Sequence, residues 1–323
     1  MFKSSWEKTS VTYQLPEGMV EKMVRLAYPN QKLISSELIA GGCANLNYKI
    51  QLEDETQPLI LRIYVRDKTA AYREQKLVEL LKKTVPVPRT YYIGELEGHQ
   101  FAMTEFMSGI SLRDLFLGCV PHDLSTIMHE VGITLSNISA HTFSKAGFLD
   151  KDLNIIPYEF SDVIKFAQDC LTHSTVLSVL DSSIISDIQK TIEQCTHLCP
   201  TDDEKHLVHG DFDPANILVD KINDSWVVTG ILDWEFAFSG SCFWDVANML
   251  RYAHKMPPEF QNSFIDALQK NGIKLSITWR ATTYLLNILS LLDLLQRSDP
   301  QKQPKRCCDI QELINHFLAE LKK

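Results

Sequence analysis

The pattern of apolar residues changes near residue 106, and this change most constrains how the 323-residue chain can fold. Before it, short runs of β-branched and aromatic residues are separated by glycine and proline, which is typical of strands. After it, apolar residues recur three and four positions apart, which is typical of helices. The sequence therefore predicts an α+β protein with a small β-rich lobe and a larger, mainly helical lobe. We assign residues 1–106 to the first lobe, including an extension over 1–33, and residues 107–323 to the second.

The same periodicities give the expected elements of each lobe. Asp123 is the expected N-cap of one long helix, because its carboxylate can accept a backbone N–H of the first turn. A ligand is expected where the two lobes meet. The first lobe should contain strands over 36–40, 46–52, 59–65, 90–93 and 100–106, with a helix over 69–83. The second should contain further helices within 156–198 and 257–323 and two strands over 217–219 and 227–232.

Charge and composition exclude several classes of protein. The net charge of −9 argues against a general nucleic-acid binder. It suits a cationic small-molecule partner, and it equally suits a protein charged for solubility alone. The first residues contain no apolar leader, and the longest apolar stretch, 284–295, is too short to cross a bilayer. Together with eight scattered cysteines, this predicts a cytoplasmic protein with no membrane partner, and it leaves the oligomeric state open.

One short segment carries the clearest chemical signal. His209-Gly210-Asp211 is followed by Asn216, and Asp233 ends the apolar run that comes next. A carboxylate and an amide five residues apart in a proline-containing loop can face one small volume. Phosphoryl transfer needs such a pair, because one carboxylate orients the attacking hydroxyl while amide and carboxylate oxygens hold a metal ion.

With these residues the chain resembles the aminoglycoside phosphotransferase and choline kinase family, whose fold is a reduced relative of the protein kinases. The resemblance runs from about residue 34 to at least 255 and is most specific over 207–251. It implies a bilobal protein-kinase-like fold and a magnesium-dependent small-molecule kinase that uses ATP, with GTP as an alternative. By this resemblance Asp211 is the catalytic aspartate, and Asn216 and Asp233 are the magnesium ligands.

The family also clamps its nucleotide with a basic residue and a glutamate. Arg62 on the third strand occupies the position of the usual phosphate-binding lysine, and Glu74 on the next helix would hold it. Strand alternation places Ile60 on the same face as Arg62, so Ile60 could cover the base. Arginine departs from the commoner lysine and brings a planar fork instead of a point charge. A purely structural Arg62–Glu74 ion pair is the alternative.

Two further segments resemble nucleotide contacts of the family. The loop that contains Gly42 and Asn45 falls where kinases place a glycine-rich cover over the phosphates. The segment 103–109 resembles the hinge between lobes, where backbone groups of Glu105 and Met107 would bond the edge of the base.

Four other residues beside this motif have less direct roles. His209 is interpreted as a structural support of the catalytic loop, and Asp245 as a brace from the following helix. Asp213 and Glu235 could contact magnesium or substrate, or could be solvated loop carboxylates.

The spacing after Asp233 separates small-molecule kinases from protein kinases. Asp245 follows after only 12 residues, with no Ala-Pro-Glu motif between them, which leaves too little chain for a peptide platform. The acceptor is therefore expected to be a small molecule: an aminoglycoside, an amino alcohol or a sugar-like compound. The alternative function is a weakly active pseudokinase or a nucleotide-binding regulatory protein, supported by the replaced lysine.

Overall fold

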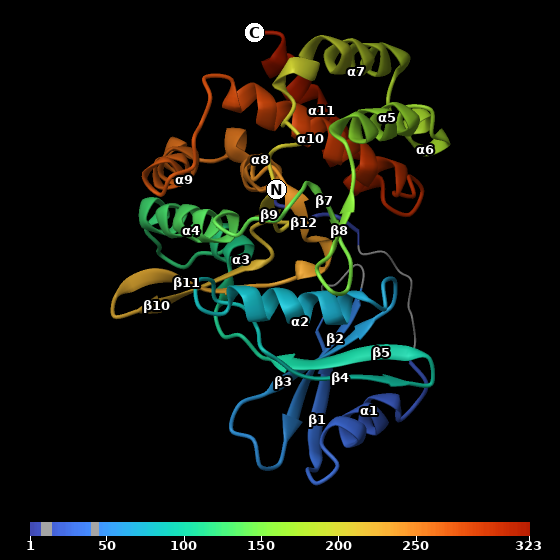
Figure 1. Cartoon of the computed structure of the whole chain (residues 1–323), viewed down its shortest axis with the longest axis vertical. Coiled ribbons are helices and arrows are strands. Elements are labelled where there is room, and N and C mark those ends of the chain that lie inside the picture. The colour runs from blue at the N-terminus through green and yellow to red at the C-terminus, as the bar shows by residue number, and fades with distance from the viewer. Residues whose placement is uncertain (8–14, 40–44) are drawn as a thin grey trace.

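The first part of the chain is built on a five-stranded antiparallel sheet, seen at the lower end of Figure 1. The structure is a computed structural model that describes residues 1–7, 15–39 and 45–323. The strand order is β1-β2-β3-β5-β4. The elements are α1 (Met19–Ala27), β1 (Leu33–Leu38), β2 (Asn45–Leu52), β3 (Leu59–Tyr64), α2 (Ala70–Leu81), β4 (Thr90–Leu96) and β5 (His99–Glu105).

The two faces of β3 have different neighbours, because side chains alternate along a strand. Leu61 and Ile63 are fully buried on the outer face, where they pack into one cluster with Met23 of α1. Each such side chain contributes about 1.5–3 kcal/mol of burial free energy. Arg62 and Tyr64 lie on the opposite face, toward α2, where Tyr64 joins a small cluster with alanines of that helix. The strand thus stabilises the lobe on one side and supplies polar groups to a site on the other.

The second part of the chain is mainly helical and forms the upper half of Figure 1. Two small sheets are inserted in it, with strand orders β11-β10-β6 and β8-β7-β12-β9. The helices are α3 (Leu112–Leu117), α4 (Leu124–Ser139), α5 (Phe160–Cys170), α6 (Ser174–Val179), α7 (Ser182–Cys195), α8 (Phe243–Leu250), α9 (Pro258–Lys270), α10 (Trp279–Gln296) and α11 (Pro304–Leu321), with 3-10 turns η1 (Thr196–Leu198), η2 (Trp234–Phe236) and η3 (Ala253–Lys255). The strands are β6 (Ile110–Ser111), β7 (Gly147–Leu149), β8 (Ile155–Pro157), β9 (His206–Val208), β10 (Ile217–Ile222), β11 (Ser225–Ile231) and β12 (Phe238–Gly240).

The α+β class and the bilobal arrangement expected from the sequence are confirmed. The N-cap at Asp123 is also found, since its carboxylate accepts the backbone N–H of Thr126 at 3.1 Å. One segment differs: residues 156 and 157, at the start of the stretch 156–198 expected to be helical, belong to β8. Its strand pairing is with β7, where Ile156 lies opposite Phe148, a tertiary contact that helical periodicity cannot indicate. Within the described ranges, no helix is both long and apolar enough to cross a bilayer.

The first residues of the chain lie in the helical part, far from α1. The N-terminus is drawn beside α8, β9 and β12 in Figure 1, while α1 lies beyond the large sheet. Phe2 is fully buried in the core of the helical part and its ring contacts those of Phe116, Tyr252 and Phe260. The extension over 1–33 is therefore divided between the two parts of the molecule. The boundary near residue 106 stays a prediction.

Candidate active site

Asp211 and Asn216 are brought together by a tight loop between β9 and β10. The turn forms because Asp213 Oδ1 accepts the N–H of Ala215 at 3.0 Å and its carbonyl accepts the N–H of Asn216 at 2.9 Å. The side-chain amide of Asn216 then donates to Asp211, both to its carbonyl oxygen (2.9 Å) and to Oδ2 (3.0 Å). Because the amide nitrogen is used in this way, the amide oxygen is the group of Asn216 left to bind a cation.

The loop is held from below by His209 and Asp245, both fully buried. Asp245 Oδ2 accepts the N–H of His209 at 2.7 Å, and Oδ1 accepts that of Gly210 at 3.0 Å. The imidazole bonds Leu232 O through Nε2 at 2.8 Å and accepts the N–H of Asp211 through Nδ1 at 3.2 Å. Burial lowers the pKa of His209, so the ring is neutral and carries its proton on Nε2. These contacts fit the supporting roles expected for both residues.

Asp233 follows β11 and lies next to the same loop. The N–H of Leu232 donates to the carbonyl oxygen of Asn216 at 2.9 Å, which ties the two segments together. Asp233 itself has φ 66° and ψ 59°, a left-handed conformation that aspartate tolerates better than most residues. Its side chain is one-third exposed. The structure thus brings Asp211, Asn216 and Asp233 together as the sequence predicted, while their roles stay predictions.

Arg62 and the residues around it form an ion-pair cluster at the junction of the two parts, here called the Arg62 cluster (Arg62, Glu74, Asp233 and Glu235). Nη1 of the arginine lies 2.5 Å from Asp233 Oδ1. Nη2 lies 3.2 Å from Glu74 Oε1 and 3.5 Å from Glu235 Oε1. Glu74 is oriented further by the hydroxyl of Tyr64, which donates to Oε2 at 2.6 Å. Arg62 and Glu74 therefore meet as predicted, and Arg62 also binds a predicted metal ligand.

The Arg62 cluster contains one cation and three carboxylates, which leaves it with excess negative charge. Burial raises the pKa of Glu235 to about 7; Arg62 opposes this shift, and Asp233 and Glu74 add to it. Burial likewise raises the pKa of Glu74. In the described residues no three His, Cys, Asp or Glu side chains form a metal site by themselves. A pair such as Asn216 and Asp233 fits magnesium, which commonly takes one or two protein ligands and completes its shell with phosphates and water.

Two side chains, one on β2 and one on α2, connect the first part of the chain to the second. Asn45 donates through Nδ2 to Glu235 Oε1 at 3.1 Å and accepts the N–H of Val65 through Oδ1 at 3.3 Å. Arg73 on α2 donates to the carbonyl oxygens of Glu235 (2.9 Å) and Leu149 (3.3 Å). The side chain of Asn45, predicted to contact nucleotide, thus bridges the two parts here. Gly42, the other predicted residue of this loop, lies outside the described residues.

The residues predicted to hold the base lie along β3 and at the end of β5. Ile60 pairs with Thr104 across the sheet and shares its face of the strand with Arg62. The N–H of Glu105 donates to Arg89 O at 2.8 Å, so that group is already used by the protein. The carbonyl oxygen of Glu105 and the N–H of Met107 are therefore the backbone groups we assign to the base edge. Nothing in the structure tests this assignment.

A second cation, Lys3, lies against Asp211. Its Nζ is 3.1 Å from Asp211 Oδ1 and 3.2 Å from Asp213 Oδ2. Burial opposes the charge on Lys3, but the two carboxylates prevail and raise its pKa, while Lys3 holds the pKa of Asp211 below its usual range despite burial. Arg251, 1% exposed, also lowers the pKa of Asp211. We call Lys3, Asp211, Asp213 and Arg251 the Lys3 cluster.

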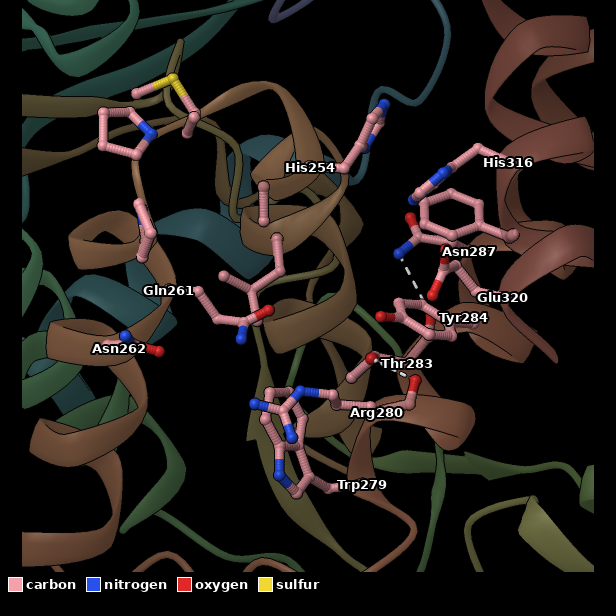
Figure 2. A pocket seen from close by; sticks show the side chains of 16 residues that line it. His254, Gln261, Asn262, Trp279, Arg280, Thr283, Tyr284, Asn287, His316 and Glu320 are labelled. Atoms are coloured by element: carbon pink, nitrogen blue, oxygen red, sulfur yellow. Dashed lines mark hydrogen bonds between the residues drawn. The ribbon is translucent and has the colours of Figure 1, made fainter. Parts of the chain in front are cut away.

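A separate hollow of about 310 Å³ lies between η3, α9, α10 and α11, as Figure 2 shows. His254 and His316 stack at its edge with ring centroids 3.8 Å apart. Asn287 on its wall accepts a hydrogen bond from Arg251 Nε at 2.8 Å. Arg251 also donates to Asn248 at 2.6 Å, and Asn248 donates to the carbonyl oxygen of Gly210 at 3.2 Å. This wall is therefore connected to the catalytic loop through buried polar side chains.

Comparison with known proteins identifies the family to which the chain belongs. The model of the phosphotransferase enzyme family, abbreviated APH, matches residues 35–283, which include the catalytic loop, Arg62 and Asp233. The chain belongs to this family. A curated relative from Staphylococcus aureus, the uncharacterized protein in the ileS 3′ region, is 32% identical over 69 residues, which are 21% of this chain. The chain spans about half the length of that relative, 53%.

Solved structures of similar shape show that this phosphotransferase-family chain has the protein-kinase-like fold of aminoglycoside phosphotransferases. A thermostable variant of APH(4)-Ia, solved with AMP-PNP and hygromycin B, has a TM-score of 0.68 at 17% identity, over 93% of this chain and 98% of that one. APH(2″)-IIIa, solved with GDP and kanamycin, has a TM-score of 0.69 at 17% identity, over 94% and 99%. At this identity the likeness establishes the fold.

Sequence reasoning missed three side chains that shape the site in this family member. Tyr64 could have been found from strand alternation, because it follows Ile60 and Arg62 on the same face of β3. Arg73 precedes Glu74 on α2, and its contact with Glu235 depends on how the two lobes meet. Lys3 has no signal at all in the sequence, since its partners follow more than 200 positions later.

Proposed function

We propose that this protein transfers the γ-phosphoryl group of ATP, with GTP as the alternative, to a hydroxyl group of a small molecule. One observation supports this most: segments far apart in the chain bring Asp211, Asn216 and Asp233 together, with Arg62 beside them. That set matches what in-line phosphoryl transfer requires, namely a carboxylate for the hydroxyl, oxygen ligands for a metal and a cation for the phosphates. Aminoglycosides, amino alcohols and sugar-like compounds are the candidate acceptors.

In this proposal Asp211 positions the acceptor. Its side chain is 31% exposed, and the hydrogen bonds from Asn216 fix its orientation. The carboxylate accepts the hydrogen bond of the acceptor hydroxyl and points the hydroxyl oxygen at the γ-phosphorus. As the new P–O bond forms, the bond from the γ-phosphorus to the bridging oxygen breaks, ADP leaves, and Asp211 takes the proton of the hydroxyl. The support from Asp245 and His209 keeps the loop from moving during this step.

Arg62 binds the phosphates in the same proposal. Its Nη1 contact with Asp233 is exchanged for phosphate oxygens, while Glu74 keeps the guanidinium on its side of the site. Asn216 and Asp233 would hold magnesium, which would supply positive charge to stabilise the nucleotide phosphates. Such fixed cations act mainly by stabilising charge that develops during transfer.

The test is a steady-state assay of ADP release with Mg-ATP against a panel of aminoglycosides, amino alcohols and sugars. We expect at least one acceptor to be phosphorylated, and Asp211→Ala to abolish this transfer while the protein keeps its melting temperature within a few degrees. An Asp211→Ala variant as active as the parent on the same acceptor would refute the assigned mechanism.

The second candidate is a nucleotide-binding regulatory protein with weak or no transfer. A specific observation favours it, because two catalytic carboxylates already bind cations of the chain itself: Asp233 binds Arg62, and Asp211 binds Lys3. If ATP binds tightly by calorimetry, but no acceptor in the panel is phosphorylated and no ATP is hydrolysed, this candidate replaces the first.

A further inference from the structure

The position of Lys3 at Asp211 is built into the fold, because both sides of the lysine are anchored. On one side, Phe2 is fully buried among the rings of Tyr252 and Phe260. Its ring centroid is 5.5 Å from that of Tyr252, in an edge-to-face arrangement that is favourable for aromatic pairs. A side chain buried to this degree fixes the backbone of the residue that follows it.

On the other side, the chain is attached to the start of α11. Trp6 donates through Nε1 to Asp309 Oδ2 at 2.8 Å. Glu7 accepts the backbone N–H groups of Lys305 and Arg306 at 2.9 and 3.1 Å, in the first turn of that helix. A carboxylate at this end of a helix satisfies unpaired N–H groups and complements the helix dipole. Residues 1–7 therefore form a strap, held at both ends, that passes the carboxylates of Asp211 and Asp213.

The backbone of the strap is strained where it delivers the lysine. Phe2 and Lys3 have φ values of 51° and 57°, in the left-handed region that non-glycine residues rarely adopt. Such conformations persist only where surrounding contacts impose them, and they concentrate at functional sites. Here the contacts of Phe2 and of Trp6 impose them, and the result is an ammonium group aimed at Asp211 and Asp213.

Lys3 opposes the negative charge of the Lys3 cluster without any ligand. Its ammonium group is within ion-pair distance of both Asp211 and Asp213, and the buried Arg251 acts on Asp211 through space. Asp213 is only 1% exposed, so Lys3 neutralises it from inside the protein. Lys3 Nζ donates one hydrogen bond, to Asp211 Oδ1, and forms an ion pair with Asp213 Oδ2 at 3.2 Å. An ammonium group on an acceptor would therefore approach the positive charge of Lys3. Without Lys3, the same group would approach the two carboxylates of Asp211 and Asp213.

We propose that Lys3 is a specificity-determining residue of the acceptor site, which selects hydroxyl compounds that carry no ammonium group beside the reacting hydroxyl. This inference rests on the proposed phosphoryl transfer, and it narrows the candidate acceptors from aminoglycosides and amino alcohols to uncharged or anionic alcohols. The positive charge of Lys3 beside Asp211 repels amines. Because Asp211 remains 31% exposed, the acceptor hydroxyl can reach the carboxylate while Lys3 stays in place.

The experiment compares binding of the cationic probe kanamycin to the parent protein and to Lys3→Gln, both saturated with magnesium and AMP-PNP. Glutamine keeps a polar side chain of similar length and removes the charge. We expect kanamycin to bind Lys3→Gln at least about tenfold more tightly by calorimetry, as removal of one like charge within a few ångströms implies. Lys3→Arg, which restores the charge, should return to the affinity of the parent protein.

The matched control is Lys22→Gln, which makes the same change in net charge on an exposed lysine of α1. Equal kanamycin affinity in parent and Lys3→Gln, no binding by either, or an equal gain in Lys22→Gln would each overturn the proposal. The two hypotheses fail separately. Phosphoryl transfer that depends on Asp211, together with unchanged kanamycin affinity in Lys3→Gln, refutes only the role of Lys3. Absence of transfer to every acceptor refutes the proposed function.

Discussion

The Arg62 cluster and the Lys3 cluster contact different carboxylates of the site and differ in their charge balance. Arg62 contacts three carboxylates, those of Glu74, Asp233 and Glu235. Lys3 contacts two, those of Asp211 and Asp213, and Arg251 acts on Asp211 through space. The side proposed for nucleotide thus has the larger excess of carboxylates over contacting cations, which magnesium would reduce.

The two clusters also differ in how the fold delivers their cation. Arg62 is part of the central strand of a five-stranded sheet, and its position is set by strand pairing on both sides. Lys3 is carried by a short strap whose position depends on Phe2 and Trp6. Strand pairing gives one fixed geometry, whereas a strap can be altered by changing either anchor without disturbing the sheet. We therefore expect the proposed acceptor specificity to be easier to change by mutation than the proposed nucleotide binding.

The largest effect on activity is expected from replacing Asp211, which belongs to the Lys3 cluster. Asp211→Asn keeps the size of the side chain and removes the proton acceptor, so kcat should fall about 10²–10⁴-fold, the usual range for a general base. The affinity for Mg-ATP, measured by calorimetry, should change less than about threefold, because the Arg62 cluster is intact. A large loss of nucleotide affinity with little change in kcat would show that the two clusters do not divide the work as described.

The next largest effect on activity is expected from Asp233→Asn, which changes the charge of the Arg62 cluster. It removes one negative charge, a proposed magnesium ligand and the 2.5 Å partner of Arg62. We expect kcat/KM for ATP to fall at least about 10–100-fold, since loss of an outer-shell partner of a metal ligand already costs that much. High magnesium should restore much of the activity, with a weakened apparent affinity for the metal. Restoration at high magnesium with unchanged metal affinity would contradict the ligand assignment.

The control for this variant is Asp224→Asn. Asp224 lies in the exposed turn between β10 and β11 and has a left-handed φ of 65°, which asparagine accepts. Asp224→Asn makes the same change in net charge as Asp233→Asn. It should leave kcat/KM within about twofold of the parent, since an exposed ion pair contributes little to stability.

Arg62→Lys should test whether the planar fork matters in the Arg62 cluster. Lysine keeps the charge but cannot direct two nitrogens at Glu74 and Asp233 in one plane. We expect about a tenfold loss of ATP affinity, measured by calorimetry, with a smaller change in kcat. Arg25→Lys, on an exposed i,i+4 pair of α1, is the matched control and should have no effect. An unchanged or increased ATP affinity in Arg62→Lys would mean that the guanidinium is no better than the usual lysine.

The smallest effect is expected at a pair outside both clusters, His254 and His316. The pKa of His254 is lowered to about 4, first by loss of hydration and then by His316 and Lys255. The folded state therefore resists protonation, and stability that is present above pH 6.5 should decrease as the pH falls from 6.5 to 4. Because the side chain is partly exposed to solvent, which weakens this effect, we expect only about 0.5–1 kcal/mol.

Urea unfolding at pH 7 and pH 5 provides the measurement, with His254→Gln beside the parent protein. The variant should lose less stability between the two pH values than the parent does. The same loss in both proteins would show that the histidine stack does not couple protonation to folding.

Local patterns in the sequence were enough for most of the fold. The helix after Asp123 follows from a cap and an apolar stripe, and both are found. Strand alternation placed Ile60 and Arg62 on one face of β3, as observed. These features depend on neighbours within a few positions, so a single sequence contains the information. Residues 156 and 157 escaped this reasoning because β8 exists only through its pairing with β7.

For the candidate site, the sequence indicated the residues but not the contacts that they make with one another. It indicated Asp211, Asn216 and Asp233 from their spacing and suggested that Glu74 holds Arg62. It could not indicate that Arg62 would bind Asp233, because that contact joins two lobes whose orientation depends on the whole interface. It also could not show that Asn45 would bridge to Glu235.

The sequence by itself therefore determined the reaction class that the site suggests, since the groups for phosphoryl transfer lie close together in one loop and at one strand end. Only the tertiary structure decided the charge around those groups. Lys3 lies on a strap more than 200 positions before Asp211, and no local sequence pattern connects these two residues. Charges act through space, so a residue distant in the chain can affect a site whose reactive groups lie close together in the sequence.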